Sequence, residues 1–135
     1  MSSPVQLSVV ALCFNEAGNL PELVRRLLAV FERRGIAGEI VLVNDGSRDD
    51  TASVIDALAT QHPEVVAVHH PSNRGIAAAW ESGLEHAQGE HVCFIDADLQ
   101  YLPEDVWRLW RELQLPSADL VQGYRSSIGR LRDSR

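Results

Sequence analysis

The feature that most constrains this chain is a regular alternation of short apolar runs with segments of helical periodicity. Short, continuous apolar runs bounded by polar turns are typical of buried strands. They occupy residues 7–13, 39–43, 65–68, 91–95 and 119–122. Between them, apolar side chains recur every three or four residues, which predicts helices over about 20–34, 50–61, 76–87 and from 103 onward. Strands that alternate with helices predict an α/β fold with a mostly parallel sheet and helices on both faces.

Local signals mark the two ends of the first helix. Asn19 followed by Glu22 has the spacing of a capping box, in which each side chain binds the backbone N–H of the other residue. Pro21 suits the first turn, because its missing N–H has no helical partner there. Gly35 is expected to end the helix, since glycine readily adopts the left-handed conformation found after helices.

Length and charge exclude several classes of protein. The 135 residues correspond to one domain, and a 45% hydrophobic content is enough for an ordinary core. The net charge is −7, and all twelve basic residues are arginines. A negative chain is a poor partner for nucleic acid, so we expect no nucleic-acid binding.

The cysteines and histidines give no sign of a zinc site. Cys13 and Cys93 lie in apolar runs and are expected to be buried free thiols. His69 and His70 end an apolar run without a partner at ligand spacing, so we treat both as structural or exposed. The stretch contains neither a signal peptide nor an apolar run of about eighteen residues, so it is not expected to span a membrane.

Polar residues gather where the predicted strands end. In open parallel sheets, ligands bind beyond the carboxyl ends of the strands. The residues that follow four of the runs are Phe14-Asn15-Glu16, Asn44 to Thr51, Asp96 to Gln100, and Gly123-Tyr124-Arg125. We therefore expect carboxylates, amides and one arginine to share one edge of the sheet.

Asp96 and Asp98 are the strongest candidates for cation binding. Their spacing after a strand lets both carboxylates point the same way across a turn, where they would repel each other unless a cation or a raised pKa offsets the charge. Hard oxygen ligands suit Mg²⁺ or Mn²⁺, and Gln100 can add a neutral oxygen. The alternative is that one aspartate caps the next helix while the other is simply exposed.

Asp45 and Arg125 each allow two interpretations. Asp45 begins an Asp-Gly-Ser sequence that is common in turns, with Asp49 or Asp50 as an N-cap for the following helix. It could instead accept hydrogen bonds from a nucleotide base or ribose. Arg125 is either a solvated side chain or a partner for phosphate at the acidic edge.

Four of these segments together resemble the family-2 glycosyltransferases of GT-A fold, which have a Rossmann-like sheet. They are Val9 to Glu16, Val43 to Thr51, Asn73-Arg74-Gly75 and Phe94 to Gln100, in the order and with the separations usual in that family. The sequence Asp-Ala-Asp-Leu-Gln followed by Pro103-Glu104, and Gly123-Tyr124-Arg125, look most like the branch of dolichol- and polyprenyl-phosphate sugar synthases.

The resemblance implies a role for each matching position. The expected nucleotide-sugar-binding residues are Leu12, Phe14, Glu16, Val43, Asp45, Asp96, Ala97, Asp98 and Arg125. Within this set, Val43 and Asp45 would hold the base, and Arg125 would steady phosphate charge. Asp96, Asp98 and Gln100 would hold the Mg²⁺ or Mn²⁺ ion. The chain departs from the family pattern at Leu12, where proline is frequent, and at Asn44, where aspartate is frequent.

The implied activity is metal-dependent transfer of a hexose from UDP- or GDP-sugar to an acceptor, with inversion. In the branch named above the acceptor is a polyprenyl phosphate, whose anionic oxygen needs no general base from the protein. Family domains continue past residue 135, so the chain is expected to be a truncated nucleotide-sugar-binding part, and no catalytic base can be assigned. Such a protein would be cytoplasmic, with any membrane association through segments that this sequence does not contain.

Two other functions remain open at this point. A haloacid-dehalogenase-like phosphatase also uses Asp-x-Asp after a strand, but its pair follows the first strand and acts with a lysine, which this chain lacks. A non-catalytic nucleotide-sugar-binding module would keep the base-binding and metal-binding residues without transferring sugar. A dinucleotide oxidoreductase is favoured even less than the phosphatase, because the first strand-to-helix turn has only Gly18 and no Gly-x-Gly-x-x-Gly sequence.

Overall fold

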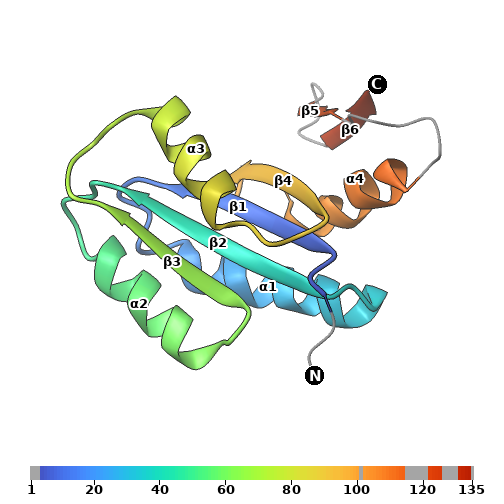
Figure 1. Cartoon of the computed structure of the whole chain (residues 1–135), viewed down its shortest axis with the longest axis horizontal. Coiled ribbons are helices and arrows are strands. Elements are labelled where there is room, and N and C mark those ends of the chain that lie inside the picture. The colour runs from blue at the N-terminus through green and yellow to red at the C-terminus, as the bar shows by residue number, and fades with distance from the viewer. Residues whose placement is uncertain (1–3, 101, 115–121, 126–130, 135) are drawn as a thin grey trace.

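A four-stranded parallel sheet forms the centre of the molecule (Figure 1). The computed structural model describes residues 4–100, 102–114, 122–125 and 131–134, the last two ranges as backbone only. The strands are β1 (Leu7–Cys13), β2 (Gly38–Asp45), β3 (Val65–His70) and β4 (His91–Asp96), in the order β3-β2-β1-β4. β1 and β2 are central, and β4 pairs with the side of β1 opposite to β2, so the order of the strands reverses between β1 and β4, as in other doubly wound folds.

Helices cover both faces of this sheet, as the alternating pattern predicts. α1 (Leu20–Arg34) and α2 (Thr51–Gln61) pack on one face, and α3 (Ile76–His86) packs on the other (Figure 1). A short 3-10 turn, η1 (Pro103–Asp105), leads into α4 (Val106–Leu113), whose Val106 joins the α1 side. Among the described residues, none of the helices combines the length and the apolar character that crossing a bilayer requires.

The apolar core lies mainly between the sheet and α1. Along β1, Leu7, Val9 and Ala11 face α1, whereas Val10 faces α3, as the two-residue period of a strand requires. β1 and β2 are buried on both faces, which explains their nearly continuous apolar sequences. Cys13 is buried and free, and burial raises the pKa of its thiol.

The predicted fifth strand of the parallel sheet is wrong. β5 (Gln122–Arg125) pairs antiparallel with β6 (Leu131–Ser134) in a separate two-stranded sheet. A strand followed closely by another apolar-polar segment can pair with it across a short connection, which competes with the longer crossover that parallel pairing needs. The rest of the predicted run, residues 119–121, lies outside the described residues.

The predicted signals mark both ends of α1, and Pro21 lies in the first turn as expected, but the hydrogen bonds of the capping box do not form. Gly35 ends α1 in the left-handed conformation, with φ 64° and ψ 38°. Asn19 is the N-cap by position, but its side chain makes no capping hydrogen bond. Its Nδ2 instead donates to Glu16 Oε2 at 2.7 Å, which holds the side chain toward the preceding turn, and its Oδ1 accepts from no backbone N–H of the helix.

Candidate nucleotide-binding site

One pocket opens at the carboxyl ends of the strands, where β1, β2 and β4 meet the start of α3. It encloses about 520 Å³ of space, part of which is continuous with solvent. Its lining residues come from three strand ends and one helix: Leu12, Cys13, Phe14, Glu16, Asp45, Ile76, Ala79, Asp96, Ala97 and Asp98. Open α/β sheets bind ligands at this edge.

Most of the site residues predicted from the sequence lie together in this pocket. Every predicted position at the ends of β1 and β4 lines it except Gln100, and Asp45 contributes from β2. Sequence reasoning missed Cys13, Ile76 and Ala79. The Asn-Arg-Gly turn before α3 was the available signal for the two α3 residues, because it determines where the first turn of that helix begins.

Two predicted residues do not line the pocket, and the side chain of a third is not described. Val43 is fully buried, packs in the core on the α3 side and is not among the lining residues. Gln100 is exposed, and its backbone N–H donates to Asp98 Oδ1 at 3.0 Å. The side chain of Arg125 lies outside the described residues, and its strand belongs to the separate β5–β6 sheet.

The end of β4 is a tight turn that carries two carboxylates. The Ala97 N–H donates to the Leu12 carbonyl at 3.1 Å, which continues the pairing with β1 and buries Ala97 between the two aspartates. Leu99 has a φ of 61°, unusual for a residue other than glycine. Partial burial and the negative charge of Asp98 raise the pKa of Asp96, so these carboxylates repel each other as the sequence predicts.

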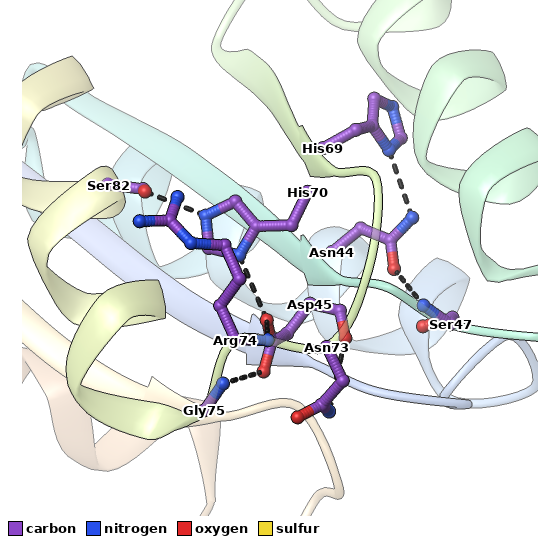
Figure 2. A network of polar contacts seen from close by, with 9 residues as sticks. All are labelled: Asn44, Asp45, Ser47, His69, His70, Asn73, Arg74, Gly75 and Ser82. Atoms are coloured by element: carbon purple, nitrogen blue, oxygen red, sulfur yellow. Dashed lines mark hydrogen bonds and ion pairs between the residues drawn. The ribbon is translucent and has the colours of Figure 1, made fainter.

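The end of β2 is a closed polar network rather than an open turn (Figure 2). Asp45 is buried, and its carboxylate accepts from the Arg74 N–H at 2.8 Å, the Gly75 N–H at 3.0 Å and His70 Nδ1 at 2.9 Å. Burial opposes ionisation, but these hydrogen bonds outweigh it and hold the pKa of Asp45 below its ordinary value. Asp45 is therefore an ionised carboxylate that can only accept hydrogen bonds.

The turn after β2 is also held by close contact with the segment before α3. Gly46 has a φ of 70°, and a Cβ there would lie 2.3 Å from the backbone of Ser72 and Asn73. Only glycine fits this approach. Asn44, at the position where the family often has aspartate, accepts from the Ser47 N–H at 2.9 Å through Oδ1 and contacts His69 Nδ1 through Nδ2 at 3.0 Å. Its amide therefore shapes the turn on one side and contacts a neighbouring strand on the other.

The loop after β1 is tied to the same turn. The Asn15 N–H donates to Ser47 Oγ at 3.0 Å, and Asn15 Oδ1 accepts from the Arg48 N–H at 2.9 Å. The Glu16 N–H donates to Thr51 Oγ1 at 2.9 Å at the start of α2. These contacts fix the backbone on either side of Phe14 and Glu16, both of which line the pocket.

The donor groups at the pocket suit a hard divalent cation only in part. No group of three or more His, Cys, Asp and Glu residues is arranged to hold a metal within the ranges that the structure describes. Asp96 and Asp98 provide two carboxylates whose mutual repulsion a cation would relieve. Mg²⁺ and related ions typically take one or two protein carboxylates and complete their shell with water and substrate phosphate oxygens, so the two aspartates fit such an ion.

The sequence matches a known family model over nearly its whole length. Residues 8–134 match the model described as glycosyl transferase family 2. The chain belongs to this family. This membership and the place of the two aspartates after β4 leave no support for the haloacid-dehalogenase-like alternative.

The relatives of this family-2 chain include proteins named undecaprenyl-phosphate 4-deoxy-4-formamido-L-arabinose transferase. The one from Pseudomonas aeruginosa is 46% identical over 134 residues, which are 98% of this chain and 37% of the relative. The one from Sodalis glossinidius is 42% identical over 113 residues, 81% of this chain and 35% of the relative. The chain thus spans little more than a third of the length of these relatives.

Solved structures confirm the GT-A type of α/β architecture for this family-2 chain. A mannosyltransferase of Pyrobaculum calidifontis, in complex with GDP-Man and Mn²⁺, has a TM-score of 0.72 and 27% identity, and the match covers 86% of this chain and 36% of that one. Residues 1–349 of TarS of S. aureus, in complex with UDP, have a TM-score of 0.58 and 26% identity, and the match covers 70% of this chain and 28% of that one.

Proposed function

We propose that this chain binds a nucleoside diphosphate sugar together with Mg²⁺ or Mn²⁺, and provides the donor-binding part of a polyprenyl-phosphate sugar transferase. The observation that carries the proposal is the single pocket in which Asp45, Asp96 and Asp98 meet at the carboxyl edge of the sheet. The family membership and the named relatives support the transferase class. The complexes of the structural neighbours with GDP-Man and Mn²⁺ or with UDP support the donor class.

The end of β2 is suited to the base or ribose. Asp45 is ionised and accepts hydrogen bonds only, so it favours ligand groups that carry N–H or O–H. Uracil and guanine both present ring N–H groups, and ribose presents hydroxyls. Phe14, which is exposed beside it in the pocket lining, offers an aromatic surface to the same part of the ligand.

The end of β4 is suited to the diphosphate and its metal ion. Asp96 and Asp98 would hold the cation, and Gln100 and Arg125 are the further groups that the family resemblance assigns to metal and phosphate. When bound, the cation supplies positive charge to a diphosphate leaving group. Without a cation the two carboxylates repel an anionic ligand, so nucleotide binding by this chain is expected to depend on the metal.

A phosphate acceptor and a hydroxyl acceptor differ in whether they need a general base. A phosphate oxygen is already anionic and can attack the anomeric carbon without giving up a proton, whereas a hydroxyl needs a general base. The names of the relatives include undecaprenyl phosphate. We therefore propose a polyprenyl phosphate as the acceptor, with attack from the face opposite the leaving diphosphate and inversion at the sugar.

Calorimetry of the 135-residue chain with UDP and GDP, with and without Mn²⁺, tests the donor half of the proposal. We expect binding of at least one of them, and only in the presence of Mn²⁺. Asp98→Ala is expected to weaken that binding about tenfold or more, because it removes a charged ligand. Asp56→Asn, an exposed change on α2, is the matched control and should bind as the wild type does.

Binding of both nucleotides at equal strength in EDTA, or unchanged binding by Asp98→Ala, would contradict the metal assignment. Absence of binding to either nucleotide would contradict the proposed function as a whole. Incubating the chain with UDP- and GDP-sugars and undecaprenyl phosphate then separates a transferase from a binding module. Release of nucleoside diphosphate that requires the lipid phosphate supports transfer, and binding without such release supports the module.

A further inference from the structure

A buried histidine links the base-facing carboxylate to the helix that forms the pocket wall. His70, the last residue of β3, lies between Asp45 and Ser82 (Figure 2). Its Nδ1 is 2.9 Å from Asp45 Oδ1, and its Nε2 is 2.7 Å from Ser82 Oγ. Its side chain is only 5% exposed, so neither nitrogen can exchange its protein partner for bulk water without a rearrangement.

We propose that His70 is a positioning residue for nucleotide binding, which orients the Asp45 carboxylate and ties it to α3. This inference rests on the donor-binding function proposed above and assigns part of that function to a residue outside the pocket lining. His70 does not line the pocket, so it acts through Asp45 and Ser82 rather than on the ligand.

The hydrogen bonds explain how His70 selects one orientation of the carboxylate. Asp45 Oδ1 accepts from both the Arg74 N–H and His70 Nδ1, whereas Oδ2 accepts from the Gly75 N–H. A carboxylate has about four lone-pair positions, so the less occupied Oδ2 keeps one for a ligand donor. Without His70 only the two backbone N–H groups hold the carboxylate, one on each oxygen, so Oδ1 and Oδ2 become alike in their free capacity and Oδ2 is no longer the preferred acceptor for a ligand.

The contact between His70 and Ser82 connects α3 to the Asp45 carboxylate. Ser82 lies on α3, and Ile76 and Ala79 of the same helix line the pocket. Nδ1 can carry the hydrogen toward Asp45 in both protonation states of the ring. The Ser82 hydroxyl can donate to Nε2 or accept from it, so the link holds in both states as well. His70 thus couples the direction of the carboxylate to the position of the pocket wall.

Two amide substitutions separate the two contacts of His70. His70→Asn places its amide near the position of Nδ1, where it can still donate to Asp45. His70→Gln places its amide near the position of Nε2, where it reaches Ser82 but not Asp45. We expect His70→Asn to keep UDP or GDP binding in Mn²⁺ within about threefold of the wild type, and His70→Gln to weaken it about tenfold. Glu85→Gln, a change of an exposed residue on α3, should leave binding unchanged.

A spectroscopic readout makes the test independent of nucleotide binding. The carboxyl ¹³C resonance of Asp45 reports its titration directly, and its pKa should rise in His70→Gln and stay near the wild-type value in His70→Asn. Equal binding and equal Asp45 titration in the two variants would overturn the role of His70. If the wild type binds neither nucleotide, the proposed function fails, and so does the role of His70 in nucleotide binding. The Asp45 titration then decides separately whether His70 holds the carboxylate.

Discussion

The ends of β2 and β4 both present aspartates to one pocket, but the protein treats their charges in opposite ways. Asp45 is buried at the end of β2 and surrounded by three hydrogen-bond donors, which lower its pKa. Asp96 is exposed at the end of β4, where partial desolvation of its carboxyl and the charge of Asp98 raise its pKa. The protein itself stabilises the charge of Asp45, whereas the charges of Asp96 and Asp98 are left unbalanced.

This difference shows which carboxylate serves the fold and which is left for a ligand. A buried charge that has all its partners within the protein contributes to stability and offers the ligand a fixed direction. Two neighbouring carboxylates with few protein donors cost stability and gain most from an external cation. The four predictions below test this contrast, from the largest expected effect to the smallest.

Removing the buried carboxylate should cost the most stability. Asp45→Ala leaves two backbone N–H groups and the His70 ring without their acceptor, so we expect a loss of about 3 kcal/mol in the free energy of unfolding. Urea denaturation followed by circular dichroism measures this loss. Asp96→Ala is the matched change at β4 and should alter stability by less than about 0.5 kcal/mol. Similar losses in the two variants would remove the contrast.

Neutralising one carboxylate of the Asp96–Asp98 pair should affect nucleotide binding rather than folding. Asp98→Asn keeps an oxygen that can accept from the Gln100 N–H, as Asp98 Oδ1 does, so the turn should persist. We expect nucleotide affinity in Mn²⁺ to fall about tenfold while the free energy of unfolding in EDTA stays the same or increases. Calorimetry and denaturation of the same preparation give both values. A stability loss as large as that of Asp45→Ala would mean that Asp98 is structural.

The two strand ends should respond to acid with opposite signs. The pKa of Asp45 lies below its ordinary value of 3.8, so the stability that its charge provides is present above that value and is lost as pH falls through the lowered pKa. The pKa of Asp96 lies above 3.8, so protonation in the folded state relieves repulsion and adds stability as pH falls through the raised pKa.

Variant pairs isolate these two contributions in metal-free buffer. The stability advantage of the wild type over Asp45→Asn should shrink only at pH values below about 4. The advantage of Asp96→Asn over the wild type should also shrink as pH falls, but in a higher pH range, because Asp96 takes up its proton above its ordinary pKa of 3.8. Denaturation curves between about pH 3 and pH 7 measure both trends. Parallel trends in the two variant pairs would contradict the opposite shifts.

The smallest effect is expected from the tether beyond β4. This tether is the ion pair between Glu104 of η1 and Arg26 of α1, which involves both carboxylate oxygens. The Arg26 guanidinium holds the pKa of Glu104 below its ordinary value. Glu104 is partly exposed, so solvent screening limits the pair, and Glu104→Gln should cost about 0.5 kcal/mol. Denaturation in low and high salt measures this cost. Nucleotide affinity should not change, because the tether lies outside the pocket lining.

The sequence by itself was sufficient to predict the parallel core and most of the residues that line the pocket. β1 and β2 are buried on both faces, so their apolar runs are continuous and unmistakable, and Gly35 marks a helix end by its backbone freedom alone. The residues that follow these strands must lie at one edge of a parallel sheet. That topological rule brings Glu16, Asp45 and Asp96 together without any knowledge of their contacts.

The sequence was insufficient to predict contacts where a side chain or strand can choose among partners from several parts of the chain. Asn19 has the spacing of a capping box, yet no capping bond forms, because its Nδ2 donates to Glu16 and holds the side chain toward the preceding turn. The run at 119–122 looked like another parallel strand, but β5 pairs with β6 instead. His70 looked merely structural or exposed, because nothing along the chain places it beside Asp45, 25 residues away.

What the sequence determined about this protein is the set of strand-end carboxylates and the edge that they share, because the positions of the strands along the chain and their side-chain period are local consequences of apolar patterning. What only the tertiary structure decided is the state of each carboxylate. The pKa of an aspartate depends on the donors and charges around it. Those of Asp45 come from β3 and from the turn before α3, segments that folding alone brings to the end of β2.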